Sequence, residues 1–162
     1  MDINEVAIRY LASRSRTIKE MKEHLKGKGY SQDEISSEID SLKLKKYLDD
    51  VSYTCEYLRY AFSKGKGMTK IKQELYQKGI EGEALSQGCY TFEDENGRDL
   101  LEIEKQVAYD EAAKTMNRVD LIDKKTISKL GRRLNSLGFK SDLIYEIVGE
   151  YMKEIKNEDY TY

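Results

Sequence analysis

The chain has 162 residues, of which 36% are charged and 39% hydrophobic, and its formal net charge is −2. With no proline and two cysteines, it cannot be a collagen, a proline-rich linker or a disulfide-stapled mini-protein, and it is too apolar to be disordered. No stretch approaches the roughly 18 apolar residues of a membrane span, and the first residues lack the basic and apolar regions of a secretory signal, so we expect a cytoplasmic protein away from membranes.

The first part of the chain carries the apolar spacing and the capping signals of three helices. Apolar residues recur at helical spacing over residues 3–12, namely Ile3, Val6, Ala7, Tyr10 and Leu11. Thr17 with Glu20, and Ser31 with Glu34, form two capping boxes. They predict the starts of a second and a third helix.

One helix pattern occurs three times: three apolar residues at helical spacing, then a glycine and another apolar residue. Its occurrences are Ile18/Met21/Leu25/Gly29/Tyr30, Met68/Ile71/Leu75/Gly79/Ile80 and Ile127/Leu130/Leu134/Gly138/Phe139. The first three residues predict an apolar stripe, and the glycine predicts a left-handed C-cap after which the chain folds back. Because a further helix precedes and follows each occurrence, the sequence predicts an all-α protein of tandem three-helix repeats, with three units and about nine helices.

The repeats place unit boundaries along the chain. The expected units are residues 3–47, 48–97 and 98–156, followed by a polar tail at 157–162. The repeat glycines are 50 and then 59 residues apart, and the turn-prone segment 93–97 is the predicted place of the nine extra residues. The run 89–92 is the only mild strand signal. Each unit is too small to bury much core alone, so neighbouring units should pack together.

Two polar segments mark the second unit. Asp50 is a good N-cap for the following helix, with Asp49 at the positive end of that helix, and we favour this capping over a paired-carboxylate metal site. Residues 64–67, Lys-Gly-Lys-Gly, lack the preceding strand and the spacing of a phosphate-binding loop. They predict a turn between helices instead, with their lysines and Lys70 exposed and open to a phosphate contact.

The small net charge is a sum of alternating blocks. Residues 1–30, 53–80 and 112–140 carry net charges of +3, +4 and +6, whereas residues 31–52, 81–111 and 141–162 carry −3, −8 and −4. The first two helices of every unit are therefore basic and the third is acidic. Either these are ordinary solvated faces, or they form a bipolar surface for an extended partner of mixed charge, such as a nucleoprotein filament.

No group of residues forms a catalytic constellation. His24 is the only histidine, and its charged neighbours predict an exposed surface residue rather than a ligand or a base. Cys55 and Cys89 form no CxxC pair and are expected to be free thiols. We therefore expect a protein that is not an enzyme, with no catalytic residues, no cofactor and no metal; an enzyme with an unrecognised site is the third and least favoured class.

The 13 tyrosines divide into two groups. Those on apolar stripes should be core residues: Tyr10, Tyr30, Tyr53, Tyr57 and Tyr109. Those expected to be exposed, and able to stack on bases or on a partner, are Tyr60, Tyr76, Tyr160 and Tyr162. Arg132 and Arg133 form the densest arginine pair, for which a partner-facing role and a solvated face are both open.

Three segments resemble the RecX family of regulatory proteins. The middle unit is the most specific: residues 47–53 read Tyr-Leu-Asp-Asp-Val-Ser-Tyr, and after Lys66 and Gly67, residues 71–80 read Ile-Lys-Gln-Glu-Leu-Tyr-Gln-Lys-Gly-Ile. The first unit contributes residues 19–30, and the last contributes Leu-Asn-Ser-Leu-Gly-Phe at 134–139. The resemblance covers about residues 5–155.

This resemblance implies a bacterial cytoplasmic modulator of the RecA recombinase, built as an elongated, curved, right-handed array of three-helix repeats. Most members bind in the groove of the RecA–single-stranded-DNA filament and inhibit recombination, ATP hydrolysis and coprotease activity. The implied processes are DNA repair, DNA recombination and the SOS response. We expect a monomer whose partner is the RecA filament.

The basic helices are the predicted contact surface, towards acidic RecA surfaces or DNA phosphates. The candidate residues are Arg14, Arg16, Lys19, Lys64, Lys66, Lys70, Lys129, Arg132 and Arg133. The alternative function is a stand-alone helical DNA-binding protein that acts without RecA, in which one repeat works like a helix-turn-helix.

Overall fold

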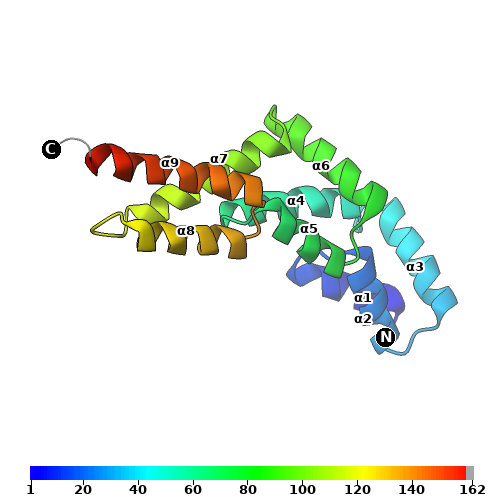
Figure 1. The fold of residues 1–162 in the computed structure, drawn as a ribbon. Helices are drawn as coiled ribbons and strands as arrows, with labels where there is room; N and C mark the ends of the chain where they lie inside the picture. Colours follow the sequence, from blue (N-terminus) through cyan, green and yellow to red (C-terminus); the bar gives the residue numbers. More distant parts are fainter. Residues whose placement is uncertain (160–162) are drawn as a thin grey trace. The chain divides into compact units, whose positions relative to one another are not determined.

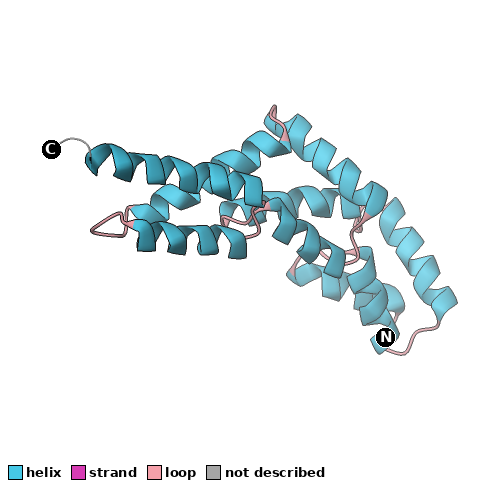
Figure 2. Ribbon diagram, viewed as in Figure 1, coloured by secondary structure: helices cyan, strands magenta, loops and turns pink. Residues whose placement is uncertain are grey.

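The protein is entirely helical in the part of the chain that its computed structural model describes, residues 1–159. Nine α helices joined by short connections span these residues (Figures 1 and 2). Their bounds are α1 Ile3–Ser13, α2 Ile18–Gly27, α3 Gln32–Leu44, α4 Asp50–Ser63, α5 Met68–Gln77, α6 Gly82–Asn96, α7 Leu100–Met116, α8 Lys124–Ser136 and α9 Ser141–Asp159. This confirms the all-α prediction of tandem three-helix repeats. Helix α9 includes residues 157–159 of the expected tail.

The residues with a mild strand signal are helical. They lie in α6, whose buried residues Gly88 and Phe92 are four positions apart. In a helix, residues four apart lie on the same face. In a strand, the residue midway between them would lie on that face as well. None of the helices within residues 1–159 is long and apolar enough to cross a membrane.

The chain divides into two compact units, called unit 1 and unit 2 from here on, whereas the three units expected from the sequence are called repeats. Unit 1 comprises residues 1–58 and 74–95, and unit 2 comprises residues 59–73 together with the chain from residue 96 onward. In unit 1, α1, α2 and α3 pack on one another, and in unit 2, α7, α8 and α9 do so. The helices α4 and α5 of the middle repeat each contribute residues to both units.

Each unit has its own hydrophobic core. In unit 1 the buried cluster is Ala7, Met21, Leu25, Ile35, Ile39, Leu42 and Leu48. In unit 2 it is Ala108, Ala112, Met116, Ile127, Leu130, Leu134, Phe139, Ile144 and Ile147. The apolar stripes of the repeated helix pattern supply much of both clusters. The amphipathic periodicity of the sequence therefore identified the residues that stabilise the fold.

The repeated glycines end three helices in the same way. Gly29, Gly79 and Gly138 have φ of +91°, +86° and +92°. In each repeat the glycine N–H donates to the carbonyl three residues earlier, and the next N–H donates to the carbonyl of the last leucine of the stripe, over 2.9–3.4 Å. This is the Schellman motif, in which a left-handed residue closes the helix and the next apolar side chain folds back on it. The predicted repeat and its C-cap are confirmed.

The turn signals predict that the nine extra residues of the third repeat lie at 93–97, but the structure places them elsewhere. Asp49 and Asp99 occupy equivalent places, since each N-caps the first helix of its repeat and the two are 50 residues apart. The extra length follows Asp99. Helix α7 has 17 residues against 14 in α4, and α8 has 13 against 10 in α5. The connection 117–123 is also longer than its counterpart 64–67.

The prediction that Asp50 caps α4 is wrong by one residue. The carboxylate of Asp49 accepts the N–H groups of Val51 and Ser52 at 3.0 and 3.2 Å, so Asp49 is the N-cap. Asp50 is the first helical residue, and its Oδ1 accepts the N–H of Ile18 at 3.0 Å. The carboxylate of Asp50 therefore makes a tertiary contact with α2 instead of capping its own helix. The capping boxes of Thr17 with Glu20 and of Ser31 with Glu34 are confirmed.

Candidate interaction surface

In unit 1, the end of α5 docks on the start of α2. Thr17 Oγ1 donates to the carbonyl of Lys78 at 2.6 Å, and Lys19 Nζ donates to the carbonyl of Gln77 at 3.2 Å. Lys78 Nζ in turn lies 3.4 Å from Glu20 Oε1. The exposed carbonyls of one helix end thus meet donors at the beginning of another, which satisfies both termini. Lys19 is therefore partly engaged in holding repeats 1 and 2 together.

In unit 2, the end of α8 docks on the start of α5 in the equivalent way. Gly67 N–H donates to the carbonyl of Leu137 at 2.7 Å, and Thr69 N–H to that of Gly138 at 3.1 Å. Lys70 Nζ donates to the carbonyl of Ser136 at 3.4 Å, the counterpart of the bond from Lys19. The sequence repeat therefore produces the same kind of helix junction twice, once in each unit. The sequence predicts an exposed Lys70, but the structure shows that this lysine is half-buried.

Each junction also contains an acid from the next repeat. Asp50 accepts the N–H of Ile18, the first residue of α2, and Glu104 Oε1 accepts the N–H of Met68, the first residue of α5, at 2.8 Å. Burial is the largest influence on the Asp50 carboxyl and raises its pKa, although the bond from Ile18 opposes the shift. Burial also acts on Glu20, but the Thr17 N–H and the charges of Lys78 and Arg14 outweigh it and lower the pKa of Glu20.

The other two candidate residues of unit 1, Arg14 and Arg16, contact residues close to them in the sequence. Arg14 Nη2 lies 3.3 Å from Glu20 Oε1. The guanidinium of Arg16 lies 3.9 Å from the centre of the Tyr10 ring, and its Nε donates to the Tyr10 carbonyl at 3.3 Å. On its other side, the Tyr10 ring stacks on His24 with centroids 3.8 Å apart and planes 3° from parallel. His24 is thus half-buried in a stack, in contrast to the exposed surface residue that we expected.

Lys64 and Lys66 gather around one aromatic ring in unit 2. Both Nζ atoms lie 5.9 Å from the centre of the Tyr60 ring, and Tyr60 is 52% exposed. Gly65 has a φ of +76° and turns the chain between the two lysines. The predicted turn between helices is confirmed, and Lys64 is exposed as expected, but Lys66 is half-buried. The arrangement offers an aromatic face flanked by two cations.

The candidate residues of α8 separate into two roles. Lys129 and Arg132 are exposed and lie one turn apart, so they share a face of the helix. Arg133 is also exposed, but its Nη2 lies 3.7 Å from Oε2 of the buried Glu111 on α7. Lys114 also contacts Glu111, at 3.5 Å. Arg132 therefore belongs to the accessible surface, whereas Arg133 neutralises a buried acid.

Three buried acids escaped sequence reasoning. Glu38, Glu104 and Glu111 are 9%, 4% and 8% exposed. Glu38 accepts a bond from Asn4 Nδ2 at 2.8 Å, and the other two have the partners described above. Each lies on the apolar side of its helix, at a position where the periodicity calls for a hydrophobic residue. In the sequence, the one signal of these buried acids is an acidic residue at a position where the helical periodicity calls for an apolar one.

The tyrosines follow the prediction in part. Tyr60 and Tyr76 are exposed, as expected, whereas Tyr160 and Tyr162 lie outside the described residues. Of the five expected in the core, Tyr53 is buried and the rest are half-buried. Neither Cys55 nor Cys89 forms a disulfide in the described part of the chain. Within residues 1–159 no three His, Cys, Asp or Glu side chains are grouped as a metal site requires.

Comparison with known proteins identifies the family. Residues 5–42 match the first three-helix domain of RecX, and residues 49–88 match the second. The chain is 31% identical to Regulatory protein RecX of Clostridium botulinum (strain Eklund 17B), over 90% of this chain and 66% of that protein. It is 30% identical to Regulatory protein RecX of Vibrio vulnificus (strain CMCP6), over 89% of each.

The fold agrees with the sequence relatives. The crystal structure of RecX from Lactobacillus salivarius superposes with a TM-score of 0.75 at 25% identity, covering 92% of this chain and 94% of the other. The chain spans about two thirds of the clostridial protein but nearly all of the Vibrio and Lactobacillus proteins. The chain therefore belongs to the RecX family of regulatory proteins.

Proposed function

We propose that this protein binds in the groove of the RecA–single-stranded-DNA filament and inhibits the recombinase, ATPase and coprotease activities of RecA. It acts in the cytoplasm as a monomer, in DNA repair and the SOS response. Membership of the RecX family, whose members are regulatory proteins, is the observation that carries the proposal. The alternating charge of the chain supports it, because a nucleoprotein filament presents both acidic phosphates and basic protein surfaces.

Among the candidate residues, Lys129 and Arg132 are the best placed to meet the filament. Both are exposed on one face of α8 and neither is an ion-pair partner of a buried group. Arg14, Arg16, Lys19, Lys70 and Arg133 also have local bonds, so their substitution would test the fold as well as the contact. Lys64 and Lys66, around Tyr60, form a second proposed contact.

The test is the ATPase activity of RecA on single-stranded DNA, titrated with this protein at substoichiometric ratios. Wild-type protein should lower the rate, and the double variant K129E/R132E should require at least about tenfold more protein for the same inhibition, as expected when two charge contacts are reversed. The matched control is K153E/K156E, which changes two exposed lysines of α9 and the net charge by the same amount. Unchanged RecA activity with the wild-type protein would exclude the proposed function.

A stand-alone DNA-binding protein is the second candidate, and the two lysines at the exposed Tyr60 favour it, because stacking and phosphate contacts do not need RecA. Tight binding to bare DNA that falls steeply with salt, together with no effect on RecA, would support this candidate. Loss of turnover of some substrate on a single side-chain change would be required before an enzyme is considered.

A further inference from the structure

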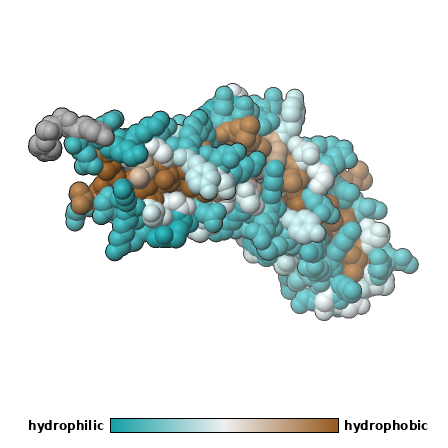
Figure 3. All heavy atoms as spheres, viewed as in Figure 1, coloured by the Kyte–Doolittle hydropathy of each residue, from teal (hydrophilic) through white to brown (hydrophobic). Residues whose placement is uncertain are grey.

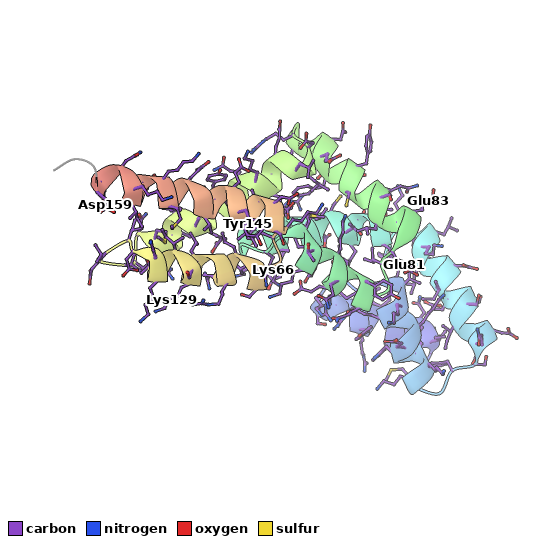
Figure 4. The ribbon with its side chains drawn as sticks, viewed as in Figure 1. Lys66, Glu81, Glu83, Lys129, Tyr145 and Asp159 are labelled. Carbon is purple, nitrogen blue, oxygen red and sulfur yellow. The ribbon has the colours of Figure 1, made fainter. Side chains whose placement is uncertain are left out.

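A groove lies between α8 and α9 in unit 2. Its lining includes Ser128, Gly131, Arg132 and Asn135 of α8 and Tyr145 and Val148 of α9. Apolar side chains reach the surface between the two helices on the face shown in Figure 3, and Figure 4 marks Tyr145 near the start of α9 and Lys129 on α8. Tyr145 is 74% exposed, so its ring is accessible at the edge of the groove.

Gly131 lines the groove without a side chain. It lies in the interior of α8 and does not have a positive φ. A Cβ atom at this position would meet only Cγ2 of Val148, at 3.7 Å, which is an ordinary contact. Alanine would therefore fit and would favour the helix. Neither a turn nor a close approach of backbone explains the glycine, and its effect on the surface is a hollow beside Arg132.

The charges around the groove favour an anion. Helix α8 carries five basic and no acidic residues. On α9, Glu146 and Glu150 face α7, where they bond Lys105 Nζ at 2.9 Å and the Tyr109 hydroxyl at 2.7 Å. Asp142 is in the first turn of α9 but is not part of the lining. The groove thus combines one cation, Arg132, with uncharged polar groups and an exposed aromatic ring, and Lys129 lies outside the lining on the same face of α8 as Arg132.

We propose that this groove binds single-stranded DNA, with an unpaired base stacked on Tyr145 and the backbone phosphates against Arg132 and Lys129. Every base has a face that stacks on an aromatic ring, whereas a duplex hides that face. Ser128 and Asn135 supply hydrogen bonds to the base or sugar edge. This inference rests on the proposed function, because it names the DNA contact of the same surface.

The experiment measures the fluorescence anisotropy of a labelled 20-nucleotide oligo(dT) titrated with the full chain at low salt. Y145A should weaken binding about tenfold, since an aromatic stack on one base is lost, and Y145F should bind like the wild type. G131A should weaken binding roughly threefold, because the added methyl group fills the groove. The matched control is G149A, which adds the same atom to the interior of α9, where nothing lies within 4 Å. A duplex of the same length should bind more weakly than the single strand.

The possible outcomes separate this inference from the proposed function. Equal oligo(dT) binding by wild type, Y145A and G131A, no binding by the wild type, or a preference for duplex would each overturn the groove assignment, even if the wild type inhibits RecA. Weakening by Y145A and G131A but not by G149A would support it. That result would stand even if the wild type left the RecA ATPase unchanged, in which case the proposed function alone would fail.

Discussion

Many charged side chains of this protein hold helices together and do not simply face solvent. Arg16 covers one face of Tyr10, Arg133 neutralises the buried Glu111, and Glu104 caps a helix of the preceding repeat. A buried charge is costly unless a partner compensates it. Substitution of such a residue therefore lowers the stability of the fold, and any effect on binding must be separated from that loss.

His24 is the residue whose protonation should change stability near neutral pH. Burial, then the positive charges of Lys28 and Arg16, lower the pKa of its imidazole from 6.5. The cavity beside it is also lined by Arg9 and contains no acid. The unfolded chain therefore takes up a proton at a higher pH than the folded protein does. The stability that the neutral ring provides is present above pH 6.5 and is lost as the pH falls through the pKa of the folded state.

We expect the melting temperature of the wild type to fall between pH 7.5 and pH 5.5, and the fall to be smaller in H24F. Phenylalanine keeps a ring against Tyr10 but cannot take up a proton. The pKa of Glu20 is lowered from 4.5, so this carboxyl titrates below the window. Burial raises the pKa of Asp50 from 3.8, and a raised carboxyl pKa makes stability fall as the pH rises, which is opposite in sign to the effect of His24. Thermal melts followed by circular dichroism at both pH values test the prediction, and equal pH dependence of the two proteins would contradict it.

At the residue scale, the sequence predicts local bonds better than tertiary ones. Thr17 and Ser31 cap their helices as predicted, because their partners are three residues away. Asp50 and Glu104 bind amides 32 and 36 residues away, and no local pattern reports such a bond. The same limit explains why adjacent Arg132 and Arg133 were not distinguished. Their difference depends on where α7 lies.

The helix ends show how equivalent elements acquire different tolerances. The three repeat glycines have nearly the same φ, but their surroundings differ. A Cβ atom at Gly29 would meet nothing within 4 Å, one at Gly79 would lie 2.5 Å from Cβ of Lys19, and one at Gly138 would lie 2.6 Å from the backbone nitrogen of Lys70. Side chains can move more readily than backbone. The last two glycines therefore serve the junctions between repeats as well as the helix ends.

We expect alanine at these positions to destabilise the protein in the order G29A, G79A, G138A. G29A should cost about 1–2 kcal/mol, the strain of a left-handed alanine. G138A should cost more than about 3 kcal/mol, because the junction of α5 and α8 must also shift. Urea unfolding measures the series. G131A is the control for a helical glycine without these constraints, and should stabilise by about 1 kcal/mol; equal losses in all three repeats would contradict the assigned contacts.

Element boundaries explain what the repeat comparison could and could not predict. Period and glycine spacing identified nine helices and the three C-caps, since both depend on neighbouring residues. The polar segment 93–97 is the predicted place of the extra length of the third repeat, yet Asp99 lies 20 residues after Gly79, just as Asp49 lies 20 residues after Gly29. Helices can lengthen by a few residues without any turn signal, so composition does not locate such growth.

At the scale of the whole molecule, the middle repeat is shared. Residues 50–58 of α4 belong to unit 1 and residues 59–63 to unit 2, while α5 changes unit between residues 73 and 74. A helix forms cooperatively along its length. Two continuous helices thus run through both units. If α4 or α5 unfolds within one unit, we expect the segment of the same helix in the other unit to fray as well. The curvature and handedness of the array stay predictions.

We therefore expect the wild type to unfold in one calorimetric transition, whose measured enthalpy equals the van't Hoff enthalpy. Gln73 is exposed in the interior of α5 beside the point where the helix changes unit. Q73P should cost about 3 kcal/mol or more by breaking that helix, and should split the transition or lower the van't Hoff enthalpy below the measured one. Q73A, which preserves the helix, should leave a single transition. Two separate transitions in the wild type would mean that the shared helices do not couple the units, because each core would then be melting without the other.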